Sequence, residues 1–136
     1  MTMMQAVRDW LGACPALEGR APGQDYLAEG AVSIAVDAVP AVSAVRRYRD
    51  GSAVRQLGFA LAVRAEYGPD GVGQRAAETI LEGAADWLRA GALPALPEGC
   101  TPLRAEITAS GYVAGTELDT ARYEMQCRLT YFQKGV

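Results

Sequence analysis

Apolar and polar side chains alternate along residues 120–132, TARYEMQCRLTYF. A period of two places successive side chains on opposite faces of a β-strand. One face is largely apolar (Ala121, Tyr123, Met125, Cys127, Leu129 and Tyr131), and the other is polar (Arg122, Glu124, Gln126, Arg128 and Thr130). Residues 103–115 alternate less regularly, and residues 115–119 separate the two runs. The pattern predicts a long antiparallel hairpin with a half-buried second strand.

Further strand-like segments come earlier in the sequence. Residues 31–37 alternate, and Pro40 interrupts the run, which favours a sheet edge or a bend. Extended character resumes at 42–49, and Asp50-Gly51-Ser52 predicts a turn that leads into 53–67, the longest strand-like run. One face of that run is large and apolar, whereas the other is mostly small (Gln56, Gly58, Ala60 and Ala62). We expect a helix to lie on the small face.

Two segments have the 3.6-residue period of amphipathic helices. The first covers residues 3–14, with Thr2 as its N-cap and Pro15 after its end. The second covers residues 73–90, with Gly91 at the position of a C-terminal cap. Gly83 is unfavourable inside a helix, so it indicates close packing on the sheet. Residues 14–30 form a connection rich in proline and glycine, which we expect to cross the surface.

These elements indicate a single domain over residues 1–136. Their order is helix, loop, strand, hairpin, helix, hairpin. Because the strands occur in pairs and do not alternate singly with helices, an α+β fold is favoured over a parallel sheet. We expect a mainly antiparallel sheet of four to five strands packed with two helices.

The length of the 53–67 run indicates an assembly. Fifteen residues of strand at ~3.3 Å each span roughly 50 Å, whereas a compact domain of this size is about 35–40 Å across. Part of the hairpin at about 42–67 is therefore expected to project beyond the core. Exposed strand edges promote aggregation unless a partner covers them. A homo-oligomer that pairs or docks the hairpin would cover them.

Charged residues cluster in two places that suit a subunit interface. Four arginines lie around the first hairpin (Arg46, Arg47, Arg49 and Arg55), and three acidic residues follow one another at a spacing of four along the second helix (Glu78, Glu82 and Asp86). Like charges at this spacing weaken an isolated helix. One hypothesis is that the arginines of one subunit meet the acidic residues of the next. The alternative is two solvated faces, partly neutralised by Arg75 and Arg89.

The composition argues against several classes of function. The formal net charge is -3, so the chain lacks the overall basic character of a typical nucleic-acid binder. Histidine, the commonest general base and metal ligand, is absent. Cys14, Cys100 and Cys127 are widely spaced and are expected to be reduced, packed thiols. No apolar run approaches the ~20 residues of a membrane span, and residues 1–11 lack a secretory signal. These features favour a protein made in a cytosol.

No motif indicates a catalytic, cofactor-binding or metal-binding site. Gly68-x-x-Gly71-x-Gly73 lacks the residues of a phosphate loop and is read as a turn before a helix. Glu117 and Asp119 fall in a predicted turn, and Ser110-Gly111-Tyr112 is read as a strand bulge. Arg46-Arg47-Tyr48 combines cations with an aromatic ring, as single-strand binders do, but one cluster is weak evidence. We expect a protein that is not an enzyme.

Three stretches resemble the minor capsid or tail-terminator-like proteins of long-tailed bacteriophages and prophages. They are Asp25-Tyr26-Leu27; residues 48–67 with Asp50-Gly51-Ser52, Arg55-Gln56 and Arg64-x-Glu66-Tyr67-Gly68; and Ser110-Gly111-Tyr112 with Asp119-Thr120-Ala121-Arg122-Tyr123 and Gln126-Cys127-Arg128-Leu129. The last stretch is the most specific. The resemblance covers most of the chain from about residue 25.

The resemblance implies a structural role at the head–tail junction of the virion. Tail terminators form a ring, typically a hexamer, that caps the tail tube and joins it to the head connector. Their fold is an antiparallel sheet flanked by helices, and no catalytic residues carry over. The implied partners are further copies of the chain, the tail tube protein and a head-completion or connector protein. DNA would pass through the lumen without sequence-specific binding, and assembly would take place in the host cytoplasm.

Two alternatives stay open. The chain would be another neck component, such as a head-completion, stopper or minor capsid protein, or it would be a small-ligand-binding or enzymatic α+β domain. The second alternative requires polar groups that converge in an apolar pocket, and the sequence offers no such set.

Overall fold

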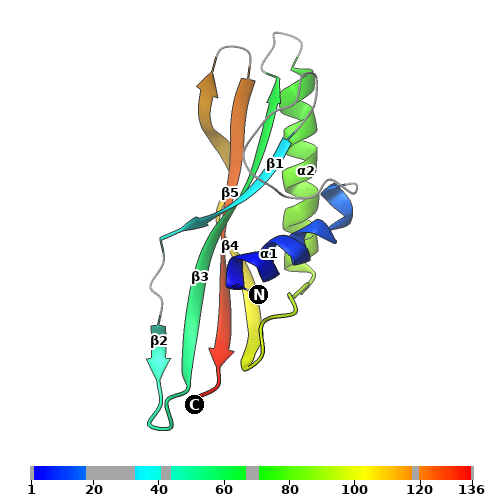
Figure 1. The fold of residues 1–136 in the computed structure, drawn as a ribbon. Helices are drawn as coiled ribbons and strands as arrows, with labels where there is room; N and C mark the ends of the chain where they lie inside the picture. Colours follow the sequence, from blue (N-terminus) through cyan, green and yellow to red (C-terminus); the bar gives the residue numbers. More distant parts are fainter. Residues whose placement is uncertain (1, 18–32, 41–43, 67–70, 118–119, 136) are drawn as a thin grey trace.

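The computed structural model describes residues 2–17, 33–40, 44–66, 71–117 and 120–135. In this part of the chain, two α-helices, one short 3-10 helix and five strands form the antiparallel α+β fold that the sequence predicted, and the sheet is open (Figure 1). The helices are α1 (Met3–Gly12), η1 (Pro15–Leu17) and α2 (Val72–Arg89). The strands are β1 (Ser33–Val39), β2 (Ala44–Arg47), β3 (Ala53–Glu66), β4 (Cys100–Glu117) and β5 (Thr120–Gln133).

The sheet has the strand order β1-β3-β5-β4, and β2 also pairs with β3. The β3–β5 pairing is unbroken from Ala53 opposite Gln133 to Glu66 opposite Thr120. Since β5 occupies one edge of β3 along its whole length, β1 and β2 lie one after the other on the opposite edge. The two long central strands therefore hold the whole sheet together.

The C-terminal hairpin is confirmed and is longer than predicted. β4 has 18 residues, so it exceeds β3, which has 14 and which we had taken as the longest strand. It also includes Gly115–Glu117, which we had assigned to the turn. Register shifts interrupt the β4–β5 pairing, and the shift between Ala109 and Tyr112 matches the bulge predicted at Ser110–Tyr112. Bulges keep a long edge strand paired while it bends.

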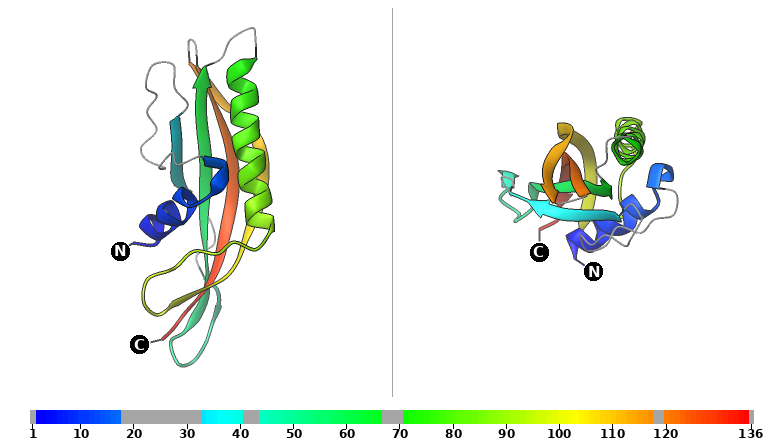
Figure 2. Two further views of the ribbon diagram at one scale, coloured as in Figure 1. Left: turned by 90° about the vertical axis from the view of Figure 1, so that its right-hand side faces the viewer. Right: turned by 90° about the horizontal axis from the view of Figure 1, so that it is seen from above.

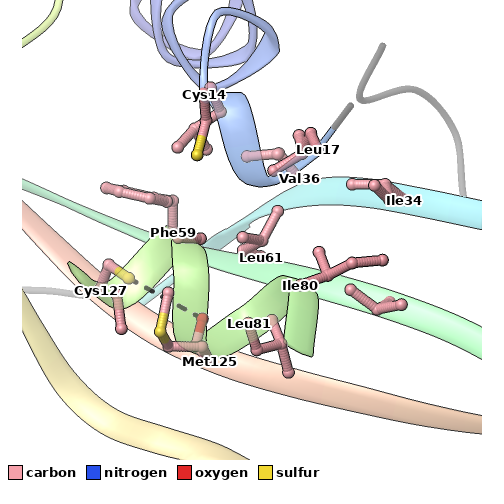
Figure 3. Packing of buried hydrophobic residues seen from close by; sticks show 14 of the residues in the cluster. Cys14, Leu17, Ile34, Val36, Phe59, Leu61, Ile80, Leu81, Met125 and Cys127 are labelled. Atoms are coloured by element: carbon pink, nitrogen blue, oxygen red, sulfur yellow. Dashed lines mark hydrogen bonds between the residues drawn. The ribbon is translucent and has the colours of Figure 1, made fainter. Parts of the chain in front are cut away.

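Both helices cover the face of the sheet that carries the large apolar side chains (Figure 1). Trp10 of α1 meets Phe59 of β3 edge to face, with ring centroids 6.1 Å apart, and it also packs on Trp87 of α2 at 5.4 Å. Figure 3 shows Phe59 and Leu61 between Cys14 and Leu17 on one side and Ile80, Leu81 and Met125 on the other. This apolar layer is the hydrophobic core.

Our expectation that a helix lies on the small face of β3 is therefore wrong. Ala60 and Ala62 are buried, but they lie outside the core that the helices form. Long polar side chains of β5 stand on this face, because Gln126 is opposite Ala60 and Glu124 is opposite Ala62. The small residues of β3 make room for these side chains.

Local signals located the start of α1 and the end of α2, whereas α1 ends at Gly12, two residues earlier than predicted. The Thr2 side chain accepts a hydrogen bond from the Gln5 amide at 3.0 Å, so Thr2 is the N-cap of α1. After α2, Gly91 has a φ of 95°, a left-handed conformation that glycine adopts without steric cost. Gly83 does mark a close contact, but the contact is with η1 and not with the sheet. A Cβ at Gly83 would lie 2.7 Å from the Cβ of Ala16.

The turn at Asp50-Gly51-Ser52 is confirmed and lies at one end of the elongated sheet (Figure 1). The Tyr48 amide donates to the Ser52 carbonyl at 2.9 Å, and Gly51 has a φ of 89°. β5 accompanies β3 to this end, so the free strand edge of the hairpin belongs to β2. In the hairpin predicted at about 42–67, residues 42–43 and 67 lie outside the described residues.

Several other predictions also concern residues outside the described part of the chain. They are the strand start at Ala31 and Val32, the connection after Leu17, most of Gly68–Gly71, the acidic residue Asp119, and the Asp25-Tyr26-Leu27 stretch of the resemblance.

Candidate subunit interface

Arg46, Arg47 and Arg49 form an exposed group at the end of the sheet, which we call the arginine arm. β2 pairs with β3 through Arg46 opposite Val54 and Arg47 opposite Ala53, so this short edge strand holds the first two side chains. All three arginines are exposed, and the described residues offer none of them an ion pair. Within the described part of the chain, the arm is therefore a concentration of positive charge without an ion-pair partner.

Arg55 is set apart from the arginine arm, although the sequence grouped it with the other three. It lies on β3, opposite Tyr131 of β5, and it is half-buried. Its guanidinium donates a hydrogen bond to the side-chain oxygen of Gln133. Arg55 therefore helps to join the strands and is not part of the exposed surface.

Two large apolar side chains accompany the arm. Val45 is 55% exposed and Tyr48 is 44% exposed. Such side chains next to arginine are typical of protein–protein interfaces, where tyrosine and arginine contribute much of the binding energy. The arm thus has the composition of a docking surface.

Glu78, Glu82 and Asp86 lie on the exposed side of α2, and we call them the acidic ridge. Glu78 accepts a hydrogen bond from the Gln74 side chain at 3.1 Å. Asp86 lies 3.7 Å from the Arg89 guanidinium, with both side chains largely in solvent, where such pairs contribute little. Glu82 has no partner among the described residues. Neutralisation within the helix is thus limited to Asp86 and Arg89, and Arg75 forms no ion pair in the described part of the chain.

A groove of about 230 Å³ runs beside the acidic ridge, between α2 and the edge strand β4. Its apolar lining comes from three elements: Leu81 and Ala85 of α2, Ile107 of β4 and Met125 of β5. The exposed side chains of Glu78, Glu82 and Arg89 also line it. Figure 2 shows α2 running along the strands on this side of the molecule.

The sequence analysis missed this groove because no single element contains it. Part of the signal was present, since Leu81 and Ala85 follow Glu78 and Glu82 by three residues and so share their side of the helix. The contributions of Ile107 and Met125 depend on how the hairpin packs against α2.

Charged side chains on the polar face of β5 are bonded within the sheet, to one another and to residues of β1 and β4. Arg122 donates to Asp37 of β1 at 2.6 Å and to Glu124 at 2.7 Å. Arg128 and Arg104 both donate to Glu106, at 3.3 Å and 2.6 Å. The Arg104 hydrogen bond, followed by the Arg128 contact, holds the pKa of Glu106 below its ordinary value. These bonds give the polar face of β5 a structural role within the sheet.

The cysteines offer little chemistry. Cys14 and Cys127 are buried, as predicted, whereas Cys100 is half-buried, and all three are free thiols. Burial raises the pKa of the Cys127 thiol to about 12, so it stays protonated and unreactive near neutral pH. The described residues contain no group of three or more histidine, cysteine or acidic side chains that could hold a metal ion.

Two further hollows lie on the side of the sheet away from the helices. Arg64, Arg122, Thr116 and Thr120 line one of about 180 Å³. Gln56, Gln126, Arg128 and Thr108 contribute to another of about 250 Å³. Arg122 is already bonded to carboxylates, and Arg128 is bonded to Glu106. Neither hollow combines an apolar pocket with free converging polar groups, which is the arrangement typical of ligand sites.

Membrane insertion finds no support in the helices: among the described residues, none is both long and apolar enough to cross a bilayer. No protein-family model matches the sequence, and no curated protein matches it at a significant level of similarity.

Proposed function

We propose that this chain is a structural subunit of the head–tail junction of a long-tailed phage or prophage. In this proposal it is a tail terminator, whose copies form a ring that caps the tail tube and joins it to the head connector. The proposal starts from the resemblance of residues 25–27, 48–67 and 110–129 to such proteins. It adds further copies of the chain, the tail tube protein and a connector protein as partners.

The observation that carries the proposal is the presence of two complementary surfaces in different places on one subunit. The arginine arm is positive and lies at the β2 edge, whereas the acidic ridge is negative and lies on α2, beside the β4 edge. A contact between two different patches is heterologous, and repeating it produces a ring when the rotation closes. A subunit of this kind suits a ring.

The net charge of -3 fits the same role. A lumen through which DNA passes has to avoid strong attraction to phosphates, because each phosphate neutralised by a cation strengthens non-specific binding. The arginines would then belong to the contacts between subunits and not to the lumen.

Another neck component, such as a head-completion, stopper or minor capsid protein, is the second candidate. Its copies would use the same two surfaces, but it would bind the portal or connector and not the tail tube. A small-ligand-binding or enzymatic domain is a weaker candidate, because the hollows on the helix-free face are lined by arginines that are already paired.

Light scattering of the purified protein, alone and with assembled tubes of a tail tube protein, tests the proposal. We expect a ring-sized oligomer in solution or on tube ends, and electron microscopy should show tubes of fixed length with capped ends. Binding to connector particles but not to tubes would favour the second candidate. A chain that stays monomeric and never binds tubes would rule out the terminator role.

A further inference from the structure

We propose that the groove between α2 and β4 receives Tyr48 of a neighbouring copy, and that Arg47 and Arg49 on either side of Tyr48 pair with Glu78 and Glu82. This inference rests on the ring proposed above and names the contact that would build it. The pairing of arginines with acidic residues does not by itself say what occupies the groove, and this inference assigns it to Tyr48.

The groove has the size and lining for an aromatic side chain. Its volume of about 230 Å³ exceeds the ~150 Å³ of an engineered apolar cavity that binds benzene. Leu81, Ala85, Ile107 and Met125 supply the apolar part of the lining, and the exposed Glu78 and Glu82 supply carboxylates. A ring inserted here would leave its polar end near the rim, as tyrosine requires.

Hydrogen bonds of the turn hold the backbone of Tyr48 in place. Its amide donates to Ser52 at 2.9 Å, and its carbonyl accepts from Gly51 at 3.1 Å. The Asp50 carboxylate accepts hydrogen bonds from the Ser52 hydroxyl and amide, and the hydroxyl bond, followed by the amide bond, holds the pKa of Asp50 below its ordinary value. The turn is therefore ordered before binding, which reduces the entropy lost on docking.

The charged residues of the two surfaces are separated by similar backbone distances. Glu78 and Glu82 are one helical turn apart, a rise of ~6 Å along α2. Arg47 and Arg49 are two residues apart, at most ~7 Å along the chain. The two arginines can therefore face the two carboxylates while Tyr48 enters between them. Docking would exclude water from the contact, and the lower local dielectric constant would strengthen both ion pairs.

The groove of the same copy is out of reach of Tyr48. The arm lies at the β2 edge, and three strand spacings of ~4.8 Å separate that edge from β4. Along the sheet, the end of β3 near the arm is level with Cys100, because Ala53 and Cys100 both pair with Gln133. Ile107 lies seven residues further, roughly 23 Å. The partner of Tyr48 must be a second copy.

Disulfide trapping tests the contact directly. One preparation carries Tyr48→Cys and another carries Glu82→Cys, both with Cys100→Ser to remove the half-buried thiol. The two are mixed, with and without tail tubes, and oxidised. We expect a cross-linked dimer of one chain of each kind, which disappears on reduction. A chain that carries both cysteines should give a ladder of larger species, because the contact is heterologous.

Val113→Cys is the matched control. Val113 is on the same strand as Ile107 and is 53% exposed, but it does not line the groove. Mixing it with Tyr48→Cys should give little dimer. Equal cross-linking at 113 and 82, or cross-linking of Tyr48→Cys to the tube protein in place of a second copy, would overturn the inference.

A second experiment separates this inference from the proposed function. Tyr48→Ala should raise the concentration needed for half-maximal assembly more than tenfold, whereas Tyr48→Phe should retain most of the assembly. If Tyr48→Ala assembles and caps tubes like the unmodified protein, the groove contact is wrong and the terminator role stands. If the unmodified chain stays monomeric with and without tubes, both are overturned.

Discussion

Arg122 reaches from β5 across β3 to Asp37 of β1, and the two side chains meet at 2.6 Å although 85 residues separate them in the sequence. The same guanidinium also donates to Glu124 at 2.7 Å. Between the two strands, Ala60 and Ala62 of β3 leave the space that the long side chain needs. This contact ties the first strand of the sheet to the last one.

Loss of Arg122 should destabilise the fold. Its side chain is only 18% exposed, and Arg122→Ala would leave the carboxylate of Glu124, which is buried to a similar degree, without this partner. Hydrogen bonds to charged groups contribute about 1.5–3 kcal/mol, so we expect the free energy of unfolding in urea to fall by about 2 kcal/mol. The matched control is Arg104→Ala, which removes an ion pair whose arginine is 60% exposed and should cost less than about 1 kcal/mol. Equal losses in the two variants would contradict the structural role of Arg122.

Gly83→Ala should be destabilising, contrary to the usual effect in a helix. Replacing glycine by alanine inside a helix ordinarily contributes about 1 kcal/mol. Here the new methyl group would lie 2.7 Å from the Cβ of Ala16, and overpacking of this kind costs about 1–3 kcal/mol. Thermal unfolding of Gly83→Ala, Ala16→Gly and the double variant forms the test. The double variant should recover most of the loss, and strictly additive effects would show that the two positions do not touch.

Burial of Cys127 predicts how stability responds to alkaline pH. The folded state keeps the thiol protonated, with its pKa raised to about 12, whereas an unfolded thiol has a pKa of about 8.5. The contribution is therefore complete below pH ~8.5 and is lost as pH rises toward 12, at about 1.4 kcal/mol per pH unit. Urea unfolding at pH 8, 9 and 10 should show this fall.

Cys127→Ala isolates that contribution from the others. Burial also raises the pKa values of Cys14 and Tyr131, so the unmodified protein has more than one cause of alkaline destabilisation. Stability should decline less steeply with pH in the variant than in the unmodified protein. Identical slopes would mean that the Cys127 thiol ionises readily in the folded state.

Thr130→Val should stabilise the protein. Thr130 is almost completely buried, and its hydroxyl has no hydrogen-bond partner among the described residues. A buried polar group without a partner costs about 1–3 kcal/mol, and valine has nearly the same shape. We expect a gain of about 1 kcal/mol in the free energy of unfolding. A loss of stability would show that the hydroxyl is hydrogen-bonded in solution.

Reversing the charge of the acidic ridge should block assembly without unfolding the subunit. Glu78→Lys, Glu82→Lys and Asp86→Lys together would face the arginine arm with like charge, while their exposed positions should leave the fold intact. Adding Arg46→Glu, Arg47→Glu and Arg49→Glu to the same chain should restore the oligomer. Light scattering at several salt concentrations measures both effects, since screening weakens exposed ion pairs. An oligomer unchanged by the first three substitutions would rule out the ridge as an interface.

The sequence determined the elements that depend on local periodicity. Alternation along residues 120–132 located β5 and assigned its two faces, because the side-chain period of a strand is a local property. The 3.6-residue period similarly located α2, and Thr2 and Gly91 marked helix ends through hydrogen bonding and a left-handed φ. The Asp50-Gly51 turn followed from the same kind of short-range chemistry.

Only the tertiary structure decided how these elements contact one another. Pro102 and Gly115 would each weaken a strand locally, yet β4 continues through them, with Pro102 opposite Tyr131 and Gly115 opposite Arg122 of β5. The small face of β3 is compatible with either a helix or long polar side chains, and Arg122 and its neighbours occupy it. The groove of Leu81, Ile107 and Met125 likewise exists because three elements meet. Periodicity describes each element by itself, whereas contacts between residues far apart in sequence depend on how all the elements pack together.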